Sequence, residues 1–505
     1  MPNNRELEIK MRLDPADVEK FASSTALKGL KADQKHFWTV YLDDRKHDLA
    51  RNGFELRVRG DGSRWIQTLK SRDGLDRGEW EAELPSEEPS LDEIGGTPAA
   101  KFIKQGTELL PVFHLQIDRR SWTVPRDGAS LEVALDTGIL TAGGRIQQIS
   151  EAELELKAGA PQRLFELAED IARQFDAPLS FISKGARGYD LASGKDSKSL
   201  DLSLTATCSA RSAFQKIANA CLRLFSQYEE SLRAGGDVEA LHQARIAIRC
   251  LRAAFSMFKT IVRGKDADEA RNELKWISDL LGKARDLDVF VEVELTRVQR
   301  QHPAVPGLDA LVEKVSSLRA AAHDQLKEAL HSLQFRHLLL LLASCIQAGE
   351  WTHKTAAQRE EQFLEFAKAE LARRFKSVTK GKKAVRGDDA LKRHRLRIKA
   401  KKLRYMAAFL NPLGPSKAYT RTTHRLKLLQ DHLGVLNDAI AGERLLGRVV
   451  RETQDPTISF AAGLVLHHNM LPRKIAKEAV KIHKKLRRSG SFQPCFKAAP
   501  RYRSC

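Results

Sequence analysis

Charged and apolar residues alternate with period two in six short segments of the first 190 residues: RELEIKMR, GFELRVRG, SRWIQTLK, GEWEAEL, ASLEVALD and ISEAELELK. Successive side chains of an extended strand point to opposite faces, so this alternation predicts strands with one charged and one apolar face. A helix is expected from Pro161 to Phe175, after the last of these strands. The first part of the chain is therefore expected to be a β-domain.

The pattern changes to long helical periodicity from Thr205 onward, with stretches rich in Leu and Ala. Residues 192–203, ASGKDSKSLDLS, are small and polar without periodicity, which is typical of a linker. We therefore expect one domain over 1–195 and a second, helical domain over 203–490. The tail from Arg487 contains one glycine and two prolines and is expected to be poorly ordered.

The helical part contains an internal duplication. LHQARIAIRCLR resembles KRHRLRIKAKKLR, with His242 aligned to His394, and LKWISDLLGKARD resembles LKLLQDHLGVLND, with Gly282 aligned to Gly434. Both pairs are separated by the same 152 positions, and two segments that share one spacing indicate a repeat. We expect two bundles, about 205–350 and 355–490, each of about four helices.

The charge of the chain divides with its pattern. Residues 1–200 carry 29 Lys and Arg against 34 Asp and Glu, which is a net charge of −5. Because the whole chain carries +20, the remaining residues carry +25. A basic half of that size predicts a polyanionic partner, which charge alone leaves open among nucleic acid, an anionic membrane surface and a phosphate polymer.

Compartment and redox state are constrained by what the sequence contains. No run of about 18 apolar residues predicts a membrane span, and the first residues, MPNNRELEIK, contain no apolar signal segment. The six cysteines include no C-x-x-C pair, so neither a disulfide framework nor a zinc site is expected. We expect a reduced, cytoplasmic protein without a membrane partner.

The charged faces of the predicted strands carry carboxylates and cations side by side. A sheet with one solvated face would show the same alternation in any single strand. Across all strands, however, rows of Glu repel unless cations lie between them, and rows of Arg and Lys repel unless anions do. Carboxylates suit Mg²⁺ or Mn²⁺, and Arg and Lys suit phosphate oxygens. A closed barrel with inward charges would hold both, as phosphoryl transfer requires.

These strands resemble the CYTH superfamily in seven motifs that follow in the family's order. The opening Glu6-x-Glu8-x-Lys10 matches the family's E-x-E-x-K signature. The others are Tyr41-Leu-Asp43, Leu56-Arg57-Val58-Arg59 with Gln67-Thr-Leu-Lys70, Arg77-x-Glu79-Trp-Glu81, Arg119-x-x-Trp122, Glu151-x-Glu153-x-Glu155 and Ser183-Lys184-x-x-Arg187-Gly-Tyr. The resemblance covers nearly all of residues 5–191.

The resemblance implies an eight-stranded antiparallel tunnel whose lumen binds a triphosphate and one or two Mg²⁺ or Mn²⁺ ions. By this resemblance, phosphate oxygens would be held by Lys10, Arg57, Arg59, Lys70, Arg119, Lys184 and Arg187. The metal would be surrounded by Glu6, Glu8, Glu79, Glu81, Glu151 and Glu153, with Glu132 and Glu155 as further candidates. Catalysis would rest on Glu6, Glu8, Lys10, Arg59 and Lys70. Whether Arg119 or its neighbour Arg120 enters the tunnel depends on strand register.

A basic stripe follows one side of the first duplicated helix. His242, Arg245, Arg249 and Arg252 fall within an arc of about 80° on a helix of 100° per residue. The duplicate helix repeats the stripe with His394, Arg397, Lys401 and Arg404. An ordinary solvated face would explain one copy, and each histidine could instead belong to a buried structural network. Repetition in a half that carries +25 favours an anion site.

The duplicated segments resemble the CHAD domain, a helical domain named for its conserved histidines that often follows a CYTH domain. His242-Gln-x-Arg245-x-x-x-Arg249 and Leu281-Gly282-x-x-Arg285-Asp286-Leu-Asp288 match the first repeat. His394-Arg-x-Arg397-x-x-x-Lys401 and Leu433-Gly434-x-x-Asn437-Asp438 match the second, in which Asn437 stands where the first repeat has Arg285. The resemblance implies paired bundles with a basic surface that binds long-chain polyphosphate.

The sequence as a whole predicts an α+β multidomain protein that hydrolyses inorganic tripolyphosphate to diphosphate and phosphate. A nucleotide or thiamine triphosphatase, or an adenylate cyclase, would use the same tunnel, although no base-specific contacts are identified. A non-catalytic polyphosphate-binding scaffold would have little use for six carboxylates. Nucleic acid is expected to bind only through charge, since few aromatic residues other than Tyr405 lie among the basic residues.

Overall fold

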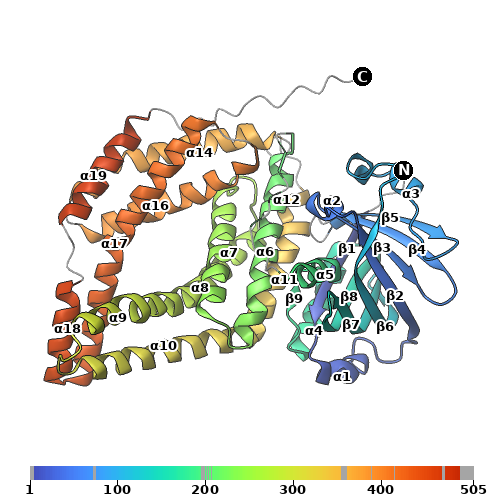
Figure 1. Ribbon diagram of the computed structural model, residues 1–505, viewed down its shortest axis with the longest axis horizontal. Coiled ribbons are helices and arrows are strands. Elements are labelled where there is room, and N and C mark those ends of the chain that lie inside the picture. The colour runs from blue at the N-terminus through green and yellow to red at the C-terminus, as the bar shows by residue number, and fades with distance from the viewer. Residues whose placement is uncertain are drawn as a thin grey trace.

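The computed structural model describes residues 5–71, 76–194, 200, 202, 204–205, 207–353, 361–387, 389–413, 416–468 and 473–489. Most of the expected linker and the tail from residue 490 lie outside the described residues. Figure 1 shows a β-domain, in blue and teal, beside a large helical domain in green to red. This α+β division confirms the fold class that the sequence predicts.

Nine antiparallel strands form the sheet of the N-terminal domain, in the order β5-β4-β3-β2-β6-β7-β8-β1-β9. The strands are β1 Arg5–Arg12, β2 Asp33–Asp43, β3 Phe54–Gly60, β4 Trp65–Ser71, β5 Asp76–Leu84, β6 Leu110–Arg126, β7 Ala129–Ala142, β8 Arg145–Ala158 and β9 Leu179–Ser180. Each charged segment named above corresponds to one of them, although GFELRVRG and SRWIQTLK begin one and two residues before β3 and β4.

Strand β1 closes the sheet into a barrel, because it pairs with β8 along one edge and with β5 along the other. Eight strands form the closed wall, as expected, and the two-residue β9 adds to β1 outside the expected count. A closed barrel leaves no open sheet edge, and alternate side chains of every strand point into its interior.

Short helices occupy the connections and ends of the barrel. They are η1 Pro15–Asp17, α1 Val18–Ala22, α2 Asp48–Arg51, α3 Asp92–Gly95, η2 Pro98–Lys101, α4 Pro161–Gln174 and α5 Lys184–Ser193. Helix α4 confirms the helix expected after the last charged strand and buries Leu164, Leu167 and Ile171 against the core. Helix α5 reaches the lumen because two glycines let it approach closely. A Cβ at Gly185 would meet the Glu55 carboxylate, and one at Gly188 would meet the Phe113 ring.

The second domain is helical throughout its described residues. Its elements are α6 Ala210–Arg233, α7 Val238–Met257, α8 Lys265–Val289, η3 Phe290–Leu295, α9 Thr296–Gln301, α10 Leu308–His331, α11 Leu333–Ala348, α12 Glu350–His353, α14 Phe363–Thr379, α15 Lys382–Arg386, α16 Ala390–Ala408, η4 Asn411–Leu413, α17 Lys417–Thr453, α18 Pro456–His468 and α19 Arg473–Arg487. Among the described helices, no single one is long and apolar enough to cross a membrane, and one bent pair, Leu308–His331 with Leu333–Thr352, passes by length and composition only.

The duplication appears in the helix boundaries. Helices α7 and α16 begin 152 positions apart, and each has an aspartate, Asp237 or Asp389, whose side chain caps the third residue of the helix. The continuous α8–η3–α9 segment covers 265–301, and α17 covers 417–453, again 152 positions later. In the first copy a π-helix, η3, interrupts the segment, and its Phe290 ring packs on Gly442, the position that is equivalent to Phe290 in the second copy.

The two domains share one hydrophobic core. Ile9 and Met11 on the outer face of β1, and the buried face of α4, belong to the same cluster as α6, α7 and α11. Ion pairs surround this contact. Arg12 of β1 pairs with the buried Glu229 of α6, and Asp176 accepts from Arg233 and Arg336 at 2.6 and 2.9 Å. The tunnel is therefore built directly on the helical domain.

Candidate active site

A charged cavity of about 290 Å³ lies inside the barrel. Its described lining holds seven carboxylates and seven cationic side chains, because alternate residues of each strand point inward. The sequence-predicted residues in this lining are Glu8, Lys10, Arg57, Arg59, Lys70, Glu79, Glu81, Arg119, Glu153 and Lys184, together with the further candidates Glu132 and Glu155. Glu6 and Arg77 pair in register between β1 and β5, and their side chains lie outside the described part of the structure.

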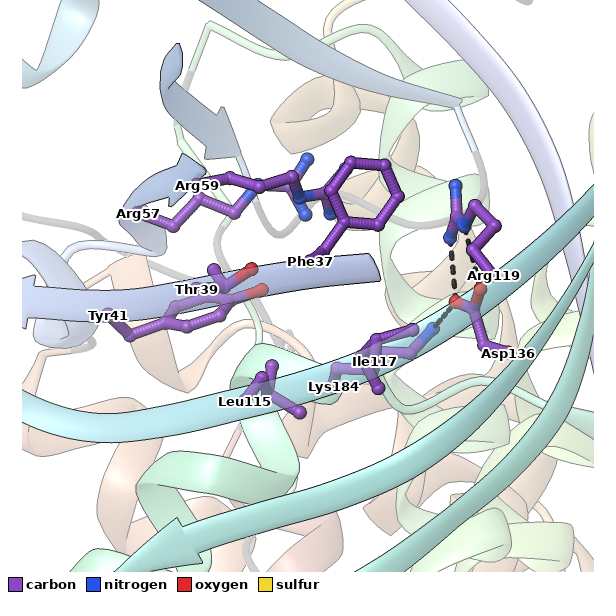
Figure 2. A pocket seen from close by; sticks show the side chains of 10 residues that line it. All are labelled: Phe37, Thr39, Tyr41, Arg57, Arg59, Leu115, Ile117, Arg119, Asp136 and Lys184. Atoms are coloured by element: carbon purple, nitrogen blue, oxygen red, sulfur yellow. Dashed lines mark hydrogen bonds and ion pairs between the residues drawn. The ribbon is translucent and has the colours of Figure 1, made fainter. Parts of the chain in front are cut away.

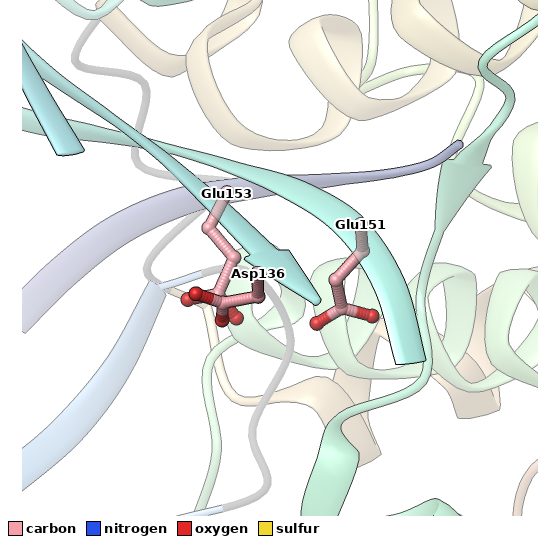
Figure 3. A group of neighbouring side chains, drawn as sticks. All are labelled: Asp136, Glu151 and Glu153. Carbon is pink, nitrogen blue, oxygen red and sulfur yellow. The ribbon is translucent and has the colours of Figure 1, made fainter. Parts of the chain in front are cut away.

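Three buried carboxylates form the innermost cluster. Oxygen atoms of Asp136, Glu151 and Glu153, from the neighbouring strands β7 and β8, lie within 4.8 Å of one another (Figure 3). Four cations surround them. Lys184 contacts all three, at 2.6 Å from Asp136 and 2.8 Å from Glu153, and Arg119 reaches Asp136 at 2.6 Å. Arg187 pairs with Glu151 and Lys10 pairs with Glu153.

These ion pairs set the protonation of the cluster. Burial alone would raise the pKa of Glu153, but Lys10, Lys184 and Arg119 outweigh it and hold that pKa well below its usual value. The pKa values of Asp136 and Glu151 are lowered in the same way against the effect of burial. The carboxylates are therefore ionised, and their charge is already balanced by side chains. A metal ion at this cluster would have to displace lysine or arginine.

A second part of the lumen carries cations in excess. Figure 2 shows Arg57 and Arg59 extending side by side toward the Phe37 ring, in a small extension of the cavity of about 10 Å³. The Arg59 guanidinium lies 4.7 Å from the centre of that ring and makes no ion pair with any described residue. The buried Nε atoms of Arg57 and Arg59 have no hydrogen-bond partner within the described part of the chain.

The electrostatics of Arg59 follow from this crowding. Burial, together with the neighbouring Arg57 and Arg119 guanidinium groups, lowers the pKa of Arg59 to about 9, which still leaves it protonated at neutral pH. A buried cation beside two others is stabilised when an anion arrives. The arrangement therefore fits phosphate oxygens, for which arginine provides a fork of donors.

A second group of carboxylates lies in a row across three adjacent strands. Glu8 of β1 stands opposite Glu155 of β8, and Glu155 stands opposite Glu132 of β7. All three line the cavity. Lys10 contacts Glu8 at 2.6 Å, and Lys157 contacts Glu155 at 2.7 Å. Carboxylate oxygens are ligands that suit Mg²⁺ or Mn²⁺, but among the described residues the group whose oxygens lie within 4.8 Å of one another is Asp136, Glu151 and Glu153.

The remaining predicted residues come from β3, β4 and β5. Lys70 pairs with Glu79 at 2.9 Å, and Arg57 lies 3.8 Å from the same carboxylate. Glu81 accepts a hydrogen bond from Thr68 at 3.1 Å. These strands place another mixture of carboxylates and cations across the lumen from β8.

The structure resolves which of the two adjacent arginines enters the tunnel. Arg119 lines the cavity, whereas Arg120 points outward and pairs with Glu19 of α1 at 2.8 Å. Sequence reasoning missed Asp136, although Glu132 and Asp136 are four positions apart on one strand and so share a face. It also missed Glu55, which accepts from Ser183 at 2.9 Å beneath Gly185.

The basic stripes of the helical domain face the helices that follow them, with matching contacts in both repeats. Arg245 pairs with Asp286 at 2.8 Å, and the equivalent Arg397 lies 3.7 Å from Asp438. Arg252 donates to Ser278 and the equivalent Arg404 to Gln430, both at 2.7 Å. All these equivalents are 152 positions apart, so the repeat extends to individual side-chain contacts.

The two stripes meet where α7 and α16 approach each other. Arg249 and Arg404 lie 5.3 and 4.7 Å from the centre of the Tyr405 ring. Burial lowers the pKa of Arg249 to about 10, and the nearby Arg245, Arg404 and Arg397 contribute to the shift, against an opposing effect of Tyr405. Cations of both repeats are thus close enough to act on one another.

The other stripe residues differ between the two copies. His394 is exposed and contacts Asn437 at 2.6 Å, while His242 is half-buried, and its pKa is lowered by burial and by Arg285. Lys401 is half-buried at the position equivalent to Arg249. The lowered pKa keeps His242 neutral at neutral pH, at the edge of a basic surface.

Family models agree with this architecture. The CYTH domain model matches residues 4–189, and the CHAD domain model matches residues 216–447. The barrel with its charged lumen is a CYTH domain, and the duplicated helical part is a CHAD domain. The chain therefore combines a CYTH domain with a CHAD domain that follows it.

Individual relatives cover different parts of the chain. An inorganic triphosphatase of Haemophilus influenzae is 32% identical over 198 residues, so the match spans 37% of this chain and 55% of that protein. An uncharacterized protein of Mycobacterium tuberculosis is 26% identical over 514 residues, 91% of this chain and 92% of that one. The crystal structure of the CHAD domain from the plant Ricinus communis is 26% identical, with a TM-score of 0.49, over 56% of this chain and 95% of that chain.

Proposed function

We propose that the tunnel hydrolyses inorganic tripolyphosphate with the help of Mg²⁺ or Mn²⁺, and that the helical domain binds long-chain polyphosphate. The observation that carries the proposal is the lumen itself, where two buried arginine Nε atoms without a hydrogen-bond partner among the described residues share one cavity with a row of carboxylates. Phosphoryl transfer needs both, because its catalysis consists mostly of positioning and of neutralising charge on oxygen. The similarity of the N-terminal part to an inorganic triphosphatase supports triphosphate as the substrate.

Each part of the lumen then has a role. Arg57 and Arg59 would hold the oxygens of one phosphate, with Arg119, Lys184 and Lys10 along the chain toward β8. Glu8, Glu155 and Glu132 would hold the divalent cation, which supplies charge neutralisation at the reacting phosphate. Asp136, Glu151 and Glu153 would hold the cations around them in place. Their oxygens lie within 4.8 Å of one another, so they would also offer a place for a metal ion when those cations turn to the phosphates.

The reaction adds one water across one P–O–P bridge and yields diphosphate and phosphate. The attacking water needs an acceptor for its proton, and Glu79 and Glu81 of β5 and Glu8 of β1, which line the cavity, are candidates for that role. The cations must hold the substrate so that one phosphorus faces that water. The described lining of the lumen is mostly charged, which favours recognition of the phosphate chain over that of a base.

The test of the tunnel proposal is phosphate release from tripolyphosphate, ATP and thiamine triphosphate, each with and without Mg²⁺ or Mn²⁺. Rapid release from tripolyphosphate that stops when the metal is chelated supports the proposal. Preference for ATP or thiamine triphosphate would indicate an organic triphosphate as substrate. Cyclic AMP as the product from ATP would indicate a cyclase.

The helical domain requires a separate test. Arg245, Arg249 and Arg397 form a surface that belongs to both repeats, and only Asp286 and Asp438 are paired with its stripe arginines in the described structure. Long-chain polyphosphate should bind with an affinity that falls as salt rises. It should also displace double-stranded DNA at equal phosphate concentration. If DNA displaced polyphosphate instead, the domain would have a different partner.

A further inference from the structure

The Phe37 ring lies in the lumen among the arginines to which the proposed function assigns phosphate. Alternate residues of β2 point inward, so Phe37, Thr39 and Tyr41 line the small extension of the cavity (Figure 2). The centre of the Phe37 ring lies 4.7 Å from the guanidinium carbon of Arg59 and 6.0 Å from that of Arg119. Both distances are within the range of about 6 Å over which an aromatic face attracts a cation.

Strand register accounts for the position of this ring. Thr39 stands opposite Arg59 of β3, so Phe37 is the diagonal neighbour of Arg59. On the other side of β2, Lys35 stands opposite Arg119 of β6, which makes Phe37 the diagonal neighbour of Arg119 as well. Diagonal neighbours on one face of a sheet are within reach of each other when the side chains are aromatic or long.

Arg59 is held differently from Arg119. Asp136 pairs with Arg119 at 2.6 Å, and such a carboxylate both fixes a guanidinium group and cancels its charge. Arg59 makes no ion pair with any described residue, and its guanidinium group lies over the Phe37 ring instead. The face of an aromatic ring attracts a cation but carries no net charge. The ring therefore orients Arg59 and leaves its positive charge for an anion.

We propose that Phe37 is a positioning residue that holds the Arg59 guanidinium group against its ring, in place to bind a phosphate of the substrate. This inference rests on the proposed function, which assigns Arg59 to phosphate oxygens. A carboxylate in place of the ring would compete with phosphate for the same donors, and an aliphatic side chain would not attract the cation. Orienting Arg59 in advance reduces the side-chain freedom that is lost when phosphate binds.

The experiment measures KM and kcat for Mg²⁺-dependent phosphate release from tripolyphosphate, and the Kd of tripolyphosphate for the full chain with all divalent cations chelated. Phe37→Leu keeps an apolar side chain but loses the aromatic face, so KM and Kd should each rise about tenfold while kcat stays within about twofold. Phe37→Tyr keeps the ring and should restore both constants. Trp38→Leu is the matched control, because Trp38 is the next residue of β2, points away from the lumen and is 54% exposed.

A double-mutant cycle tests whether Phe37 acts through Arg59. Phe37→Leu should raise KM about tenfold in the wild type but less than about twofold in Arg59→Met, because the group that the ring positions is then absent. The same rise in both backgrounds would overturn the inference, since the ring would then act without Arg59. Phe37→Met gives the same test if the leucine variant does not fold.

The outcomes separate this inference from the proposed function. Unchanged KM and Kd in Phe37→Leu would overturn the role of Phe37, as would an equal rise in Trp38→Leu. If the wild type hydrolyses tripolyphosphate with metal while Phe37→Leu matches it in both constants, only the inference about Phe37 fails. If the wild type binds tripolyphosphate without hydrolysing it, the proposed hydrolysis fails, and the Kd values still test Phe37.

Discussion

The tunnel and the helical stripes both gather cations, yet they surround them differently. In the tunnel, seven described cations alternate with seven carboxylates inside one closed wall. In the helical domain, cations of two repeats approach one another around Tyr405, and the described ion pairs of the stripes are those of Arg245 with Asp286 and of Arg397 with Asp438. The difference shows what each surface is able to do. A phosphate chain is held by cations alone, but cutting it also requires groups that bind metal and accept a proton.

The largest expected effect on tripolyphosphate turnover comes from removing a carboxylate of the tunnel, which leaves a surface dominated by cations, as in the helical stripes. Glu8→Gln removes one carboxylate of the row without changing its size, so we expect tripolyphosphate turnover to fall about a thousandfold, as for loss of a metal's contribution. Substrate should still bind, because the cations remain. Glu87→Gln, an exposed position of the same domain, is the control. Near-normal metal-dependent hydrolysis by Glu8→Gln would remove Glu8 from the site.

The contact between the β-domain and the helical domain should contribute to the free energy of unfolding. Glu229→Ala leaves Arg12 without its buried partner, and breaking such a pair costs about 3 kcal/mol of unfolding free energy. Denaturant unfolding of the full chain measures this. The neighbouring Glu230→Ala is the matched control, since Glu230 also contacts Arg12 but is 62% exposed. Equal losses from both variants would show that burial of Glu229 is unimportant.

Removing a tunnel cation should weaken binding more than it slows chemistry. Arg59→Met deletes a guanidinium group that the proposed function aims at phosphate oxygens, and charged hydrogen bonds of this kind contribute about 2 kcal/mol. The apparent KM for tripolyphosphate should rise about thirtyfold. Arg64→Met, at the exposed turn beside the same strand, should leave KM unchanged. An unchanged KM in Arg59→Met would contradict the proposed phosphate position.

The smallest expected effect is a pH dependence of the stability that the contact between the two domains contributes. A hydrogen bond to Glu169 of α4 raises the pKa of His337 of α11 to about 8 against the effect of burial, and Glu269 also contributes. The folded pKa lies above the usual value near 6.5, so the stabilisation is complete below that value. It is lost as pH rises through about 8. His337→Gln should abolish this dependence, which is worth less than about 1 kcal/mol. An unchanged pH profile of unfolding would refute it.

Much of this architecture follows from patterns along the sequence. Alternation of period two identified β1, β3, β4, β5, β7 and β8 and the face of each that turns inward, because a strand allows only two side-chain directions. Strands β2, β6 and β9 are not among the six alternating segments. The repeat spacing of 152 reappears in helix boundaries and in the Arg245–Asp286 and Arg397–Asp438 contacts. Such features are local, or are repeated in the sequence itself.

Contacts between distant segments could not be predicted in this way. Nothing in the pattern of β1 indicates that Arg12 leaves the tunnel residues and pairs with Glu229, 217 positions later. The three glutamates of β8 also look alike in the sequence, although their surroundings differ. Glu151 and Glu153 contact Lys184 and neighbouring arginines, whereas Glu155 contacts Lys157. These differences depend on how α5 and the helical domain pack against the barrel.

One comparison tests the central division of labour most directly, on the full chain with Arg245, Arg249, Arg397 and Lys401 all changed to Ala. The measurement pairs binding of long-chain polyphosphate with Mg²⁺-dependent phosphate release from tripolyphosphate. We predict that binding weakens at least about a hundredfold, since four phosphate contacts are lost. Phosphate release should remain within about twofold of the wild type, because no tunnel residue is altered. Loss of hydrolysis with polyphosphate binding intact would contradict the account.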